Sequence, residues 1–190
     1  MGLWSRLSQF YPVWLEPVLG LLIFFSFWYP LAQYPEMPAR IPIHFGFSGL
    51  PDAWTDKNLG ALLLGPLIAA ISYGGMTFLS CWIALVDDPK KVINASEKRL
   101  AAMSEARAEE VRRATLVFLF GIKLVLVAML AYLSYGETMV ALGAWEGLGW
   151  PSTALVALLL GLCGFFTWRI LVLVYGPEKY ACGQRPGGRP

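Results

Sequence analysis

Charged residues are scarce in this chain of 190 residues: only 15% are Asp, Glu, Lys or Arg, against about a quarter in an average soluble domain. Histidine is scarcer still, because His44 is the single one. One imidazole excludes a site built from several histidines, and no evident nucleophile or metal-ligand cluster accompanies it. We therefore predict a non-enzymatic protein with no catalytic residue, no metal and no cofactor.

The chain has only three cysteines, and no two of them form a CxxC pair. Cys81 and Cys163 lie within apolar segments, and Cys182 lies near the C-terminus. This arrangement excludes a disulfide framework and a cysteine-rich metal site.

The net charge of the chain is small, at +2, and the basic residues gather in a few of the segments that connect the apolar runs. That distribution is typical of membrane topology, so no nucleic-acid partner is expected.

Long apolar runs dominate the sequence. Apolar residues make up 57% of the chain. Four runs approach or exceed the roughly 20 residues that an α-helix needs to cross a bilayer. They predict an all-α membrane protein in which residues 1–190 form a single four-span domain. The predicted spans are 12–33, 59–86, 114–135 and 152–175.

Lysine and arginine are distributed unevenly among the connections, and cytoplasmic loops are normally enriched in them. The connection between the second and third spans is the richest in both. The connection at 136–151 has none, and the one at 34–58 has only Arg40 and Lys57. We therefore predict cytoplasmic termini, a cytoplasmic tail at 176–190, and an extracytoplasmic loop at 34–58, which we call the outer lid.

The predicted cytoplasmic connection, 89–113, has the composition of a helix. Asp88 and Pro89 suit an N-cap and a first helical turn, and no further proline or glycine occurs before Gly121. One helix is therefore expected to continue from Pro89 into the third span. Its apolar stripe is thin, which favours a solvated helical stalk, and the alternative is a docking surface for a partner. The stripe consists of Val92, Leu100, Met103 and Val111.

Three ionisable residues lie at predicted membrane depth, where a charge costs about 2.5 to 3.5 kcal/mol on insertion scales. They are Glu16, Lys123 and Arg169. Long basic side chains can bend toward the nearer membrane boundary, and Glu16 lies near the cytoplasmic boundary. Lys123 and Arg169 are therefore both expected within reach of Glu16. The sequence predicts a buried ionic cluster that ties the first, third and fourth spans together. A proton or ion relay is the alternative, although relays usually align several carboxylates.

The outer lid is the part of the sequence in which residue types most strongly constrain the backbone. Pro38 and Pro42 favour extended backbone. Side chains along such a segment alternate, so Ile41, Ile43 and Phe45 are predicted on one face, with Arg40, Pro42 and His44 on the other.

A chain reversal within the lid is predicted from Gly46 and Gly49. The reversal would bring His44 against Asp52, whose carboxylate can fix the imidazole tautomer. We interpret this pair as a strut that holds the lid together, with Trp54 as an anchor at the membrane boundary. The alternative interpretation is that His44 and Asp52 form a catalytic dyad or part of a metal site.

The lid also contains a specific pattern, Pro-x-x-Ile-Pro-x-His-Phe at 38–45 followed by Gly-x-x-Asp-x-Trp at 49–54. This pattern resembles the signature of the bacterial domain-of-unknown-function family 1648. In that family the motif lies in an outer loop between two spans, and it occurs in SdpI-like immunity proteins related to the sporulation-delaying-protein system. The resemblance points to the lid residues Pro38, Arg40, Ile41, Pro42, His44, Phe45, Gly49, Asp52 and Trp54 as the partner-binding motif.

The same resemblance implies a multi-span protein of the bacterial plasma (inner) membrane that protects against a secreted toxin, and that in one branch also captures a transcriptional repressor. We therefore predict a non-enzymatic protein, surrounded by membrane lipids, that binds a protein partner through the outer lid or the cytoplasmic helix. An accessory subunit of a larger membrane complex is the first alternative. A small transporter or channel component is the second.

Overall fold

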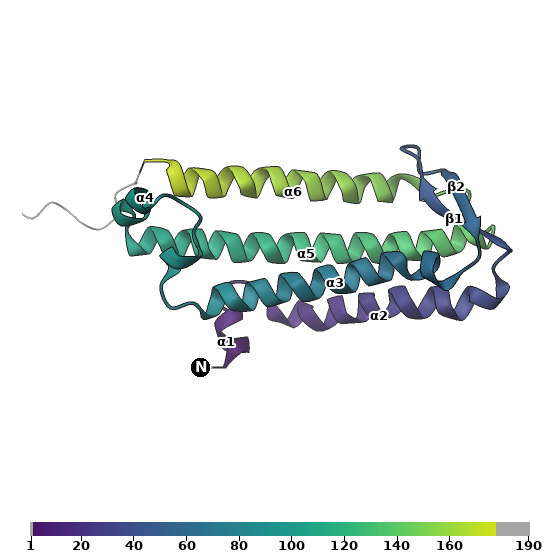
Figure 1. Ribbon diagram of the computed structural model, residues 1–190, viewed down its shortest axis with the longest axis horizontal. Coiled ribbons are helices and arrows are strands. Elements are labelled where there is room, and N and C mark those ends of the chain that lie inside the picture. Colours follow the sequence, from purple (N-terminus) through teal and green to yellow (C-terminus); the bar gives the residue numbers. More distant parts are fainter. Residues whose placement is uncertain (1, 178–190) are drawn as a thin grey trace, which may run out of the picture.

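The computed structural model describes residues 2–177, within which four long helices run side by side (Figure 1). They are α2 (Glu16–Gln33), α3 (Leu59–Leu85), α5 (Glu105–Ala141) and α6 (Gly149–Tyr175). Each is long and apolar enough to cross a membrane, α2 together with the short 3₁₀ helices η1 (Val13–Leu15) and η2 (Tyr34–Glu36) that flank it. The predicted all-α membrane fold with four spans is confirmed.

The central helix, α5, packs against α2, α3 and α6 (Figure 1). It has 37 residues, many more than the predicted span at 114–135. At 1.5 Å per residue it is about 55 Å long, so it extends beyond a hydrocarbon layer of about 30 Å. It ends just before Gly143, whose φ of 72° is a left-handed conformation that commonly follows a helix C-terminus.

The structure differs from the predicted continuous helix at 89–113. Ser96 and Ser104 each accept a hydrogen bond from a backbone N–H three residues ahead, and each therefore begins a new helix. Neither serine is followed three residues later by the Glu or Gln of a capping box, so the sequence did not mark these two N-caps clearly. The chain here forms η3 (Pro89–Val92), α4 (Glu97–Ala102) and the first turns of α5.

The apolar stripe of this connection is a packing surface and not a solvated face. Met103 and Val111 are buried together with Ile93 and with Val174 at the end of α6. Leu100 packs against this cluster. The connection is therefore folded onto the end of the helical bundle.

Arginines at this end of the bundle cap the helix C-termini. The last carbonyls of a helix have no intrahelical partner and carry partial negative charge. Arg112 donates to the carbonyl of Val86 at the end of α3. Arg99 and Arg107 together donate to the final carbonyls of α6 and the residues after it, Val172, Leu173, Val174, Gly176 and Pro177.

The opposite end of the bundle carries an antiparallel hairpin, β1 (Arg40–Phe45) and β2 (Pro51–Asp56), shown in Figure 1. Pro42 pairs with Trp54 and His44 pairs with Ala53, so Ile43 is an extra residue in β1. Such a β-bulge interrupts the alternation of side chains. The predicted alternation is therefore wrong at this point: Pro42 is buried beside Ile41, whereas Ile43 is exposed.

The hairpin is attached to the bundle on both sides. Ile41 is buried in a cluster with Met37, Leu62 of α3 and Ala141 of α5. On the other side, the carbonyl of Gly49 accepts a hydrogen bond of 2.8 Å from the backbone N–H of Leu148, in the α5–α6 connection. These contacts make the hairpin a fixed part of the fold.

Both ends of the described chain lie at the end of the bundle away from the hairpin (Figure 1). We call that end the arginine end and the other the hairpin end. The predicted tail at 176–190 lies almost entirely outside the described residues, as does Cys182. A chain that crosses a membrane four times has both ends on the same side, as observed here for the described residues.

Candidate binding site

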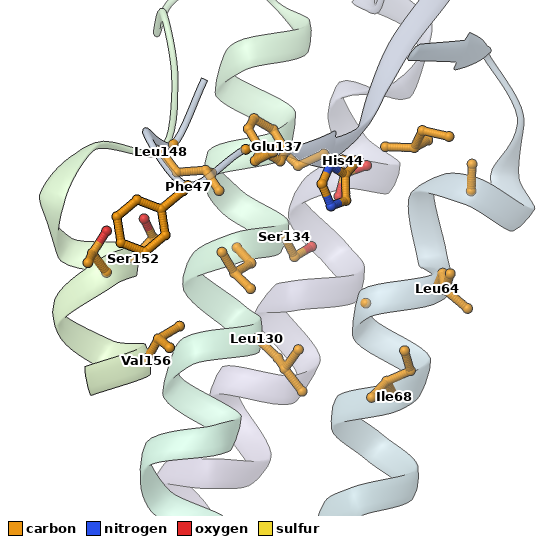
Figure 2. Close-up of a pocket in the computed structure, with 18 of the residues that line it drawn as sticks. His44, Phe47, Leu64, Ile68, Leu130, Ser134, Glu137, Leu148, Ser152 and Val156 are labelled. Carbon is orange, nitrogen blue, oxygen red and sulfur yellow. The ribbon is translucent and has the colours of Figure 1, made fainter. Parts of the chain in front are cut away.

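A pocket of about 630 Å³ lies under the hairpin, between α3, α5 and α6 (Figure 2). Leu64 and Ile68 of α3 line one side, Leu130 of α5 forms the floor, and Val156 of α6 lines the other side. These side chains make a predominantly apolar cavity within the size range of ligand sites.

The pocket opens sideways, into the zone that lipid occupies around the bundle. Leu64, Ile68 and Val156 line it, yet their exposed fractions are 58%, 46% and 46%. A closed cavity would bury its wall residues. The exposed walls therefore give a molecule dissolved in the membrane a route into the pocket.

The roof of the pocket is formed by the reversal of the hairpin. His44, Phe45 and Phe47 line it, and Phe47 is 97% exposed. His44 Nδ1 lies 2.5 Å from Asp52 Oδ1, so the predicted contact between these two side chains is present. Both side chains are more than half exposed, so the contact is a hydrogen bond at the protein surface.

The motif residues of the outer lid divide into two groups. Ile41, Pro42 and Gly49 are buried and fix the hairpin on the bundle, whereas Pro38 and Trp54 are exposed. The Arg40 side chain is also exposed, and it donates a hydrogen bond of 3.4 Å to the carbonyl of Trp54, which links the two strands. The Phe45 side chain is half-buried at the pocket roof. The motif thus combines structural residues with residues accessible from outside the fold.

Glu137 is a pocket residue that sequence analysis placed in an outer connection. It lies in α5, because helical backbone continues to Ala141, and Figure 2 shows it at the hairpin end of the pocket near His44. The run from 137 to 142 contains neither glycine nor proline, and it was the signal that the helix continues past Gly136. No hydrogen bond or ion pair joins its carboxylate to another residue in the described range 2–177.

A second polar site lies in the middle of α5. Lys123 is 18 residues from each end of this helix and only 1% exposed. Its Nζ donates a hydrogen bond of 2.5 Å to Glu16 Oε1 of α2 and another of 3.2 Å to Thr77 Oγ1 of α3. The predicted pairing of Glu16 with Lys123 is therefore present, and it joins α2, α3 and α5.

Aromatic rings surround the ammonium group of Lys123. It lies 5.1 Å from the ring centroid of Tyr73, 5.6 Å from that of Tyr11 and 5.7 Å from that of Phe120. Such faces attract a cation, and they also keep water away from the ion pair. The second carboxylate oxygen of Glu16 is buried without a hydrogen-bond partner among the described residues.

Arg169 does not belong to this ionic cluster. It lies on an exposed face of α6, and no hydrogen bond or ion pair connects it to another described residue. The prediction of a three-residue cluster is therefore wrong for Arg169. The reason is that α6 is apolar all around, so its sequence does not reveal which face turns toward α5.

Comparison with known proteins assigns part of the chain to a family. Residues 21–70 match the family described as Domain of unknown function (DUF1648). This range includes most of α2, the whole hairpin and the start of α3. No curated protein and no solved structure matches the chain. The predicted resemblance is thus confirmed for this part of the membrane protein: residues 21–70 match the DUF1648 domain.

Proposed function

We propose that the chain is a non-enzymatic protein of the bacterial plasma membrane that binds a partner at its hairpin end, in an immunity role of the SdpI-like type. The hairpin lies on the extracytoplasmic side in this proposal, because the basic residues gather at the other end. The partner is a membrane-active agent secreted from cells, which approaches from outside or through the outer leaflet.

One observation carries the proposal: the DUF1648 hairpin roofs a pocket that opens toward lipid. A membrane-active agent must enter the bilayer, and this pocket offers it an apolar binding site at the membrane boundary. The exposed Phe47 and Trp54 provide further contact surface there, since aromatic residues commonly dominate binding surfaces.

A protection assay tests this function. A strain that lacks the gene is grown in medium conditioned by its parent strain, and depolarisation of its membrane is followed with a potential-sensitive dye. We expect depolarisation of the deletion strain and recovery when the wild-type chain is expressed. The variant Trp54→Ala, expressed at the same level, should protect less.

The matched control is Glu36→Gln, which changes an exposed residue outside the lid motif and should protect fully. A deletion strain that keeps its membrane potential in conditioned medium would contradict the immunity role. So would full protection by Trp54→Ala together with full protection by a variant in which the hairpin reversal, residues 46–50, is replaced by a shorter turn.

A further inference from the structure

The pocket under the hairpin has an acidic character. Its lining includes Glu137 but, within the described residues, neither lysine nor arginine. Its one basic side chain, His44, already has the Asp52 carboxylate at its Nδ1. Glu137 is consequently the one acidic side chain of the described lining, and it has no ion-pair partner among the described residues.

Two of the four hydroxyl groups in the described lining strengthen this preference, those of Ser134 and Ser152; the other two belong to Thr55 and Thr153. Ser134 Oγ donates to the carbonyl of Ser26, and Ser152 Oγ donates to the carbonyl of Gly149. Their hydrogens are already used, so both oxygens remain available only as acceptors. A ligand that brings several hydrogen-bond donors and a positive charge matches this lining, whereas an anion does not.

The remaining walls are apolar along the direction of the helices. Ile68 and Leu130 lie deeper than Glu137, away from the hairpin (Figure 2). A molecule with a cationic head near Glu137 would extend an apolar chain past these side chains. Such a molecule is already dissolved in the bilayer, so its chain gains packing contacts in the pocket but little from leaving water, and the head group at Glu137 decides which molecules are preferred.

We propose that the pocket binds a cationic amphiphile, a molecule with one alkyl chain and a protonated primary amine, with the amine on Glu137. The alkyl chain lies between α3, α5 and α6 and enters through the sideways opening. This inference rests on the proposed function, because it names the chemistry of the agent that the hairpin end binds.

Photolabelling of the full chain in phosphatidylcholine vesicles tests this proposal. Two probes are used at equal bilayer concentration: dodecylamine and dodecanol, each with a photoreactive group at the end of the chain. Labelled residues are located by mass spectrometry. We expect saturable labelling around Ile68, Leu130 and Val156, with the amine favoured over the alcohol about ten-fold, a usual size for one hydrogen-bonded charge pair. Unlabelled dodecylamine should displace the probe.

The variant Glu137→Gln should remove the preference for the amine while labelling by the alcohol persists, which shows that the pocket is still formed. The control Glu146→Gln removes an exposed carboxylate from the α5–α6 connection and should keep the preference. If Glu137→Gln fails to fold, Glu137→Asp retains the charge and should still favour the amine.

Equal labelling by both probes in the wild-type chain would overturn the proposal, as would a preference that survives Glu137→Gln or labelling that does not saturate.

The immunity function is tested separately, by the protection assay. If Glu137→Gln still protects cells in conditioned medium and the wild-type chain shows no amine preference, the proposed function stands and this ligand assignment falls.

Discussion

Lys123 is the residue whose environment most constrains the fold. A buried ammonium group is costly, and the structure compensates it with the Glu16 carboxylate, the Thr77 hydroxyl and three aromatic rings. Removal of one partner leaves the other charge buried without compensation. The pair therefore favours the packing of α2 on α5 mainly because any arrangement that leaves one of these charges buried and unpaired has a higher free energy.

Glu16→Ala should lower the free energy of unfolding by about 3 to 5 kcal/mol, the usual cost of breaking a buried ion pair. The double variant Glu16→Ala/Lys123→Met should recover part of this loss, because no charge then remains buried. Both are measured by denaturant titration of the chain in detergent micelles. Arg169→Ala is the control and should not couple with Glu16→Ala. Strict additivity between the Glu16 and Lys123 substitutions would contradict the ion pair.

His44, Asp52 and Trp54 are expected to frame the hairpin and to perform no chemistry. His44→Asn retains a hydrogen-bonding group, so the hairpin should resist protease as in the wild type. Asp52→Ala removes the carboxylate that contacts His44, and Trp54→Ala removes the side chain of the residue that pairs with Pro42 across the strands. Both should speed cleavage between residues 34 and 58. Limited proteolysis in micelles measures this. A His44→Asn variant that keeps its resistance but no longer protects cells would instead point to a chemical role for the imidazole.

At the scale of elements, the hairpin and the α5–α6 connection meet through backbone atoms. A Cβ atom at Gly147 would lie 2.5 Å from the carbonyl oxygen of Gly49, too close for a non-bonded contact. The same carbonyl accepts the hydrogen bond from Leu148. Glycine at position 147 is therefore required for this approach.

Gly147→Ala should push the hairpin away from the connection and lower stability by about 1 to 3 kcal/mol, as overpacking does. Cleavage by chymotrypsin after Phe47 should also become faster. Gly161→Ala is the matched control, since a Cβ there meets no atom within 4 Å. Equal protease resistance in both variants would mean that the hairpin does not depend on this contact.

The end of α6 offers a second test at this scale. Arg107→Ala should increase amide hydrogen exchange at residues 172–176, because the guanidinium no longer holds the final carbonyls. Arg107→Lys should restore this only in part, since lysine lacks the forked geometry. Lys98→Ala serves as the control. Unchanged exchange in Arg107→Ala would show that the cap does not stabilise this helix end.

The sequence was most informative where one physical requirement dominates. Span length follows from bilayer thickness, so four apolar runs sufficed to predict four membrane helices. The pairing of Glu16 with Lys123 followed from the cost of a charge in lipid. Features that depend on the geometry of a single residue were missed: the bulge at Ile43, the new helix at Ser104, and the outward face of Arg169. The pocket around Glu137 was missed because it exists only when three distant segments meet.

At the scale of the whole molecule, the two ends of the bundle have different characters. The arginine end holds helix C-termini together through guanidinium–carbonyl contacts. The hairpin end presents a lipid-accessible pocket with one carboxylate. In the orientation that we propose, the first end lies in the cytoplasm and the second faces outward, where a secreted agent can reach it.

An outward-facing binding site at the hairpin end is tested most directly by thiol labelling in intact cells. Native cysteines are first replaced by serine, and single cysteines are introduced at Ser48 in the hairpin, at Glu146 in the α5–α6 connection, and at Lys98 in α4. All three positions are exposed. We predict that a membrane-impermeant maleimide reacts with the first two in intact cells, and with the third only after permeabilisation. Reaction at position 98 in intact cells, with positions 48 and 146 protected, would place the pocket in the cytoplasm and contradict the proposed orientation.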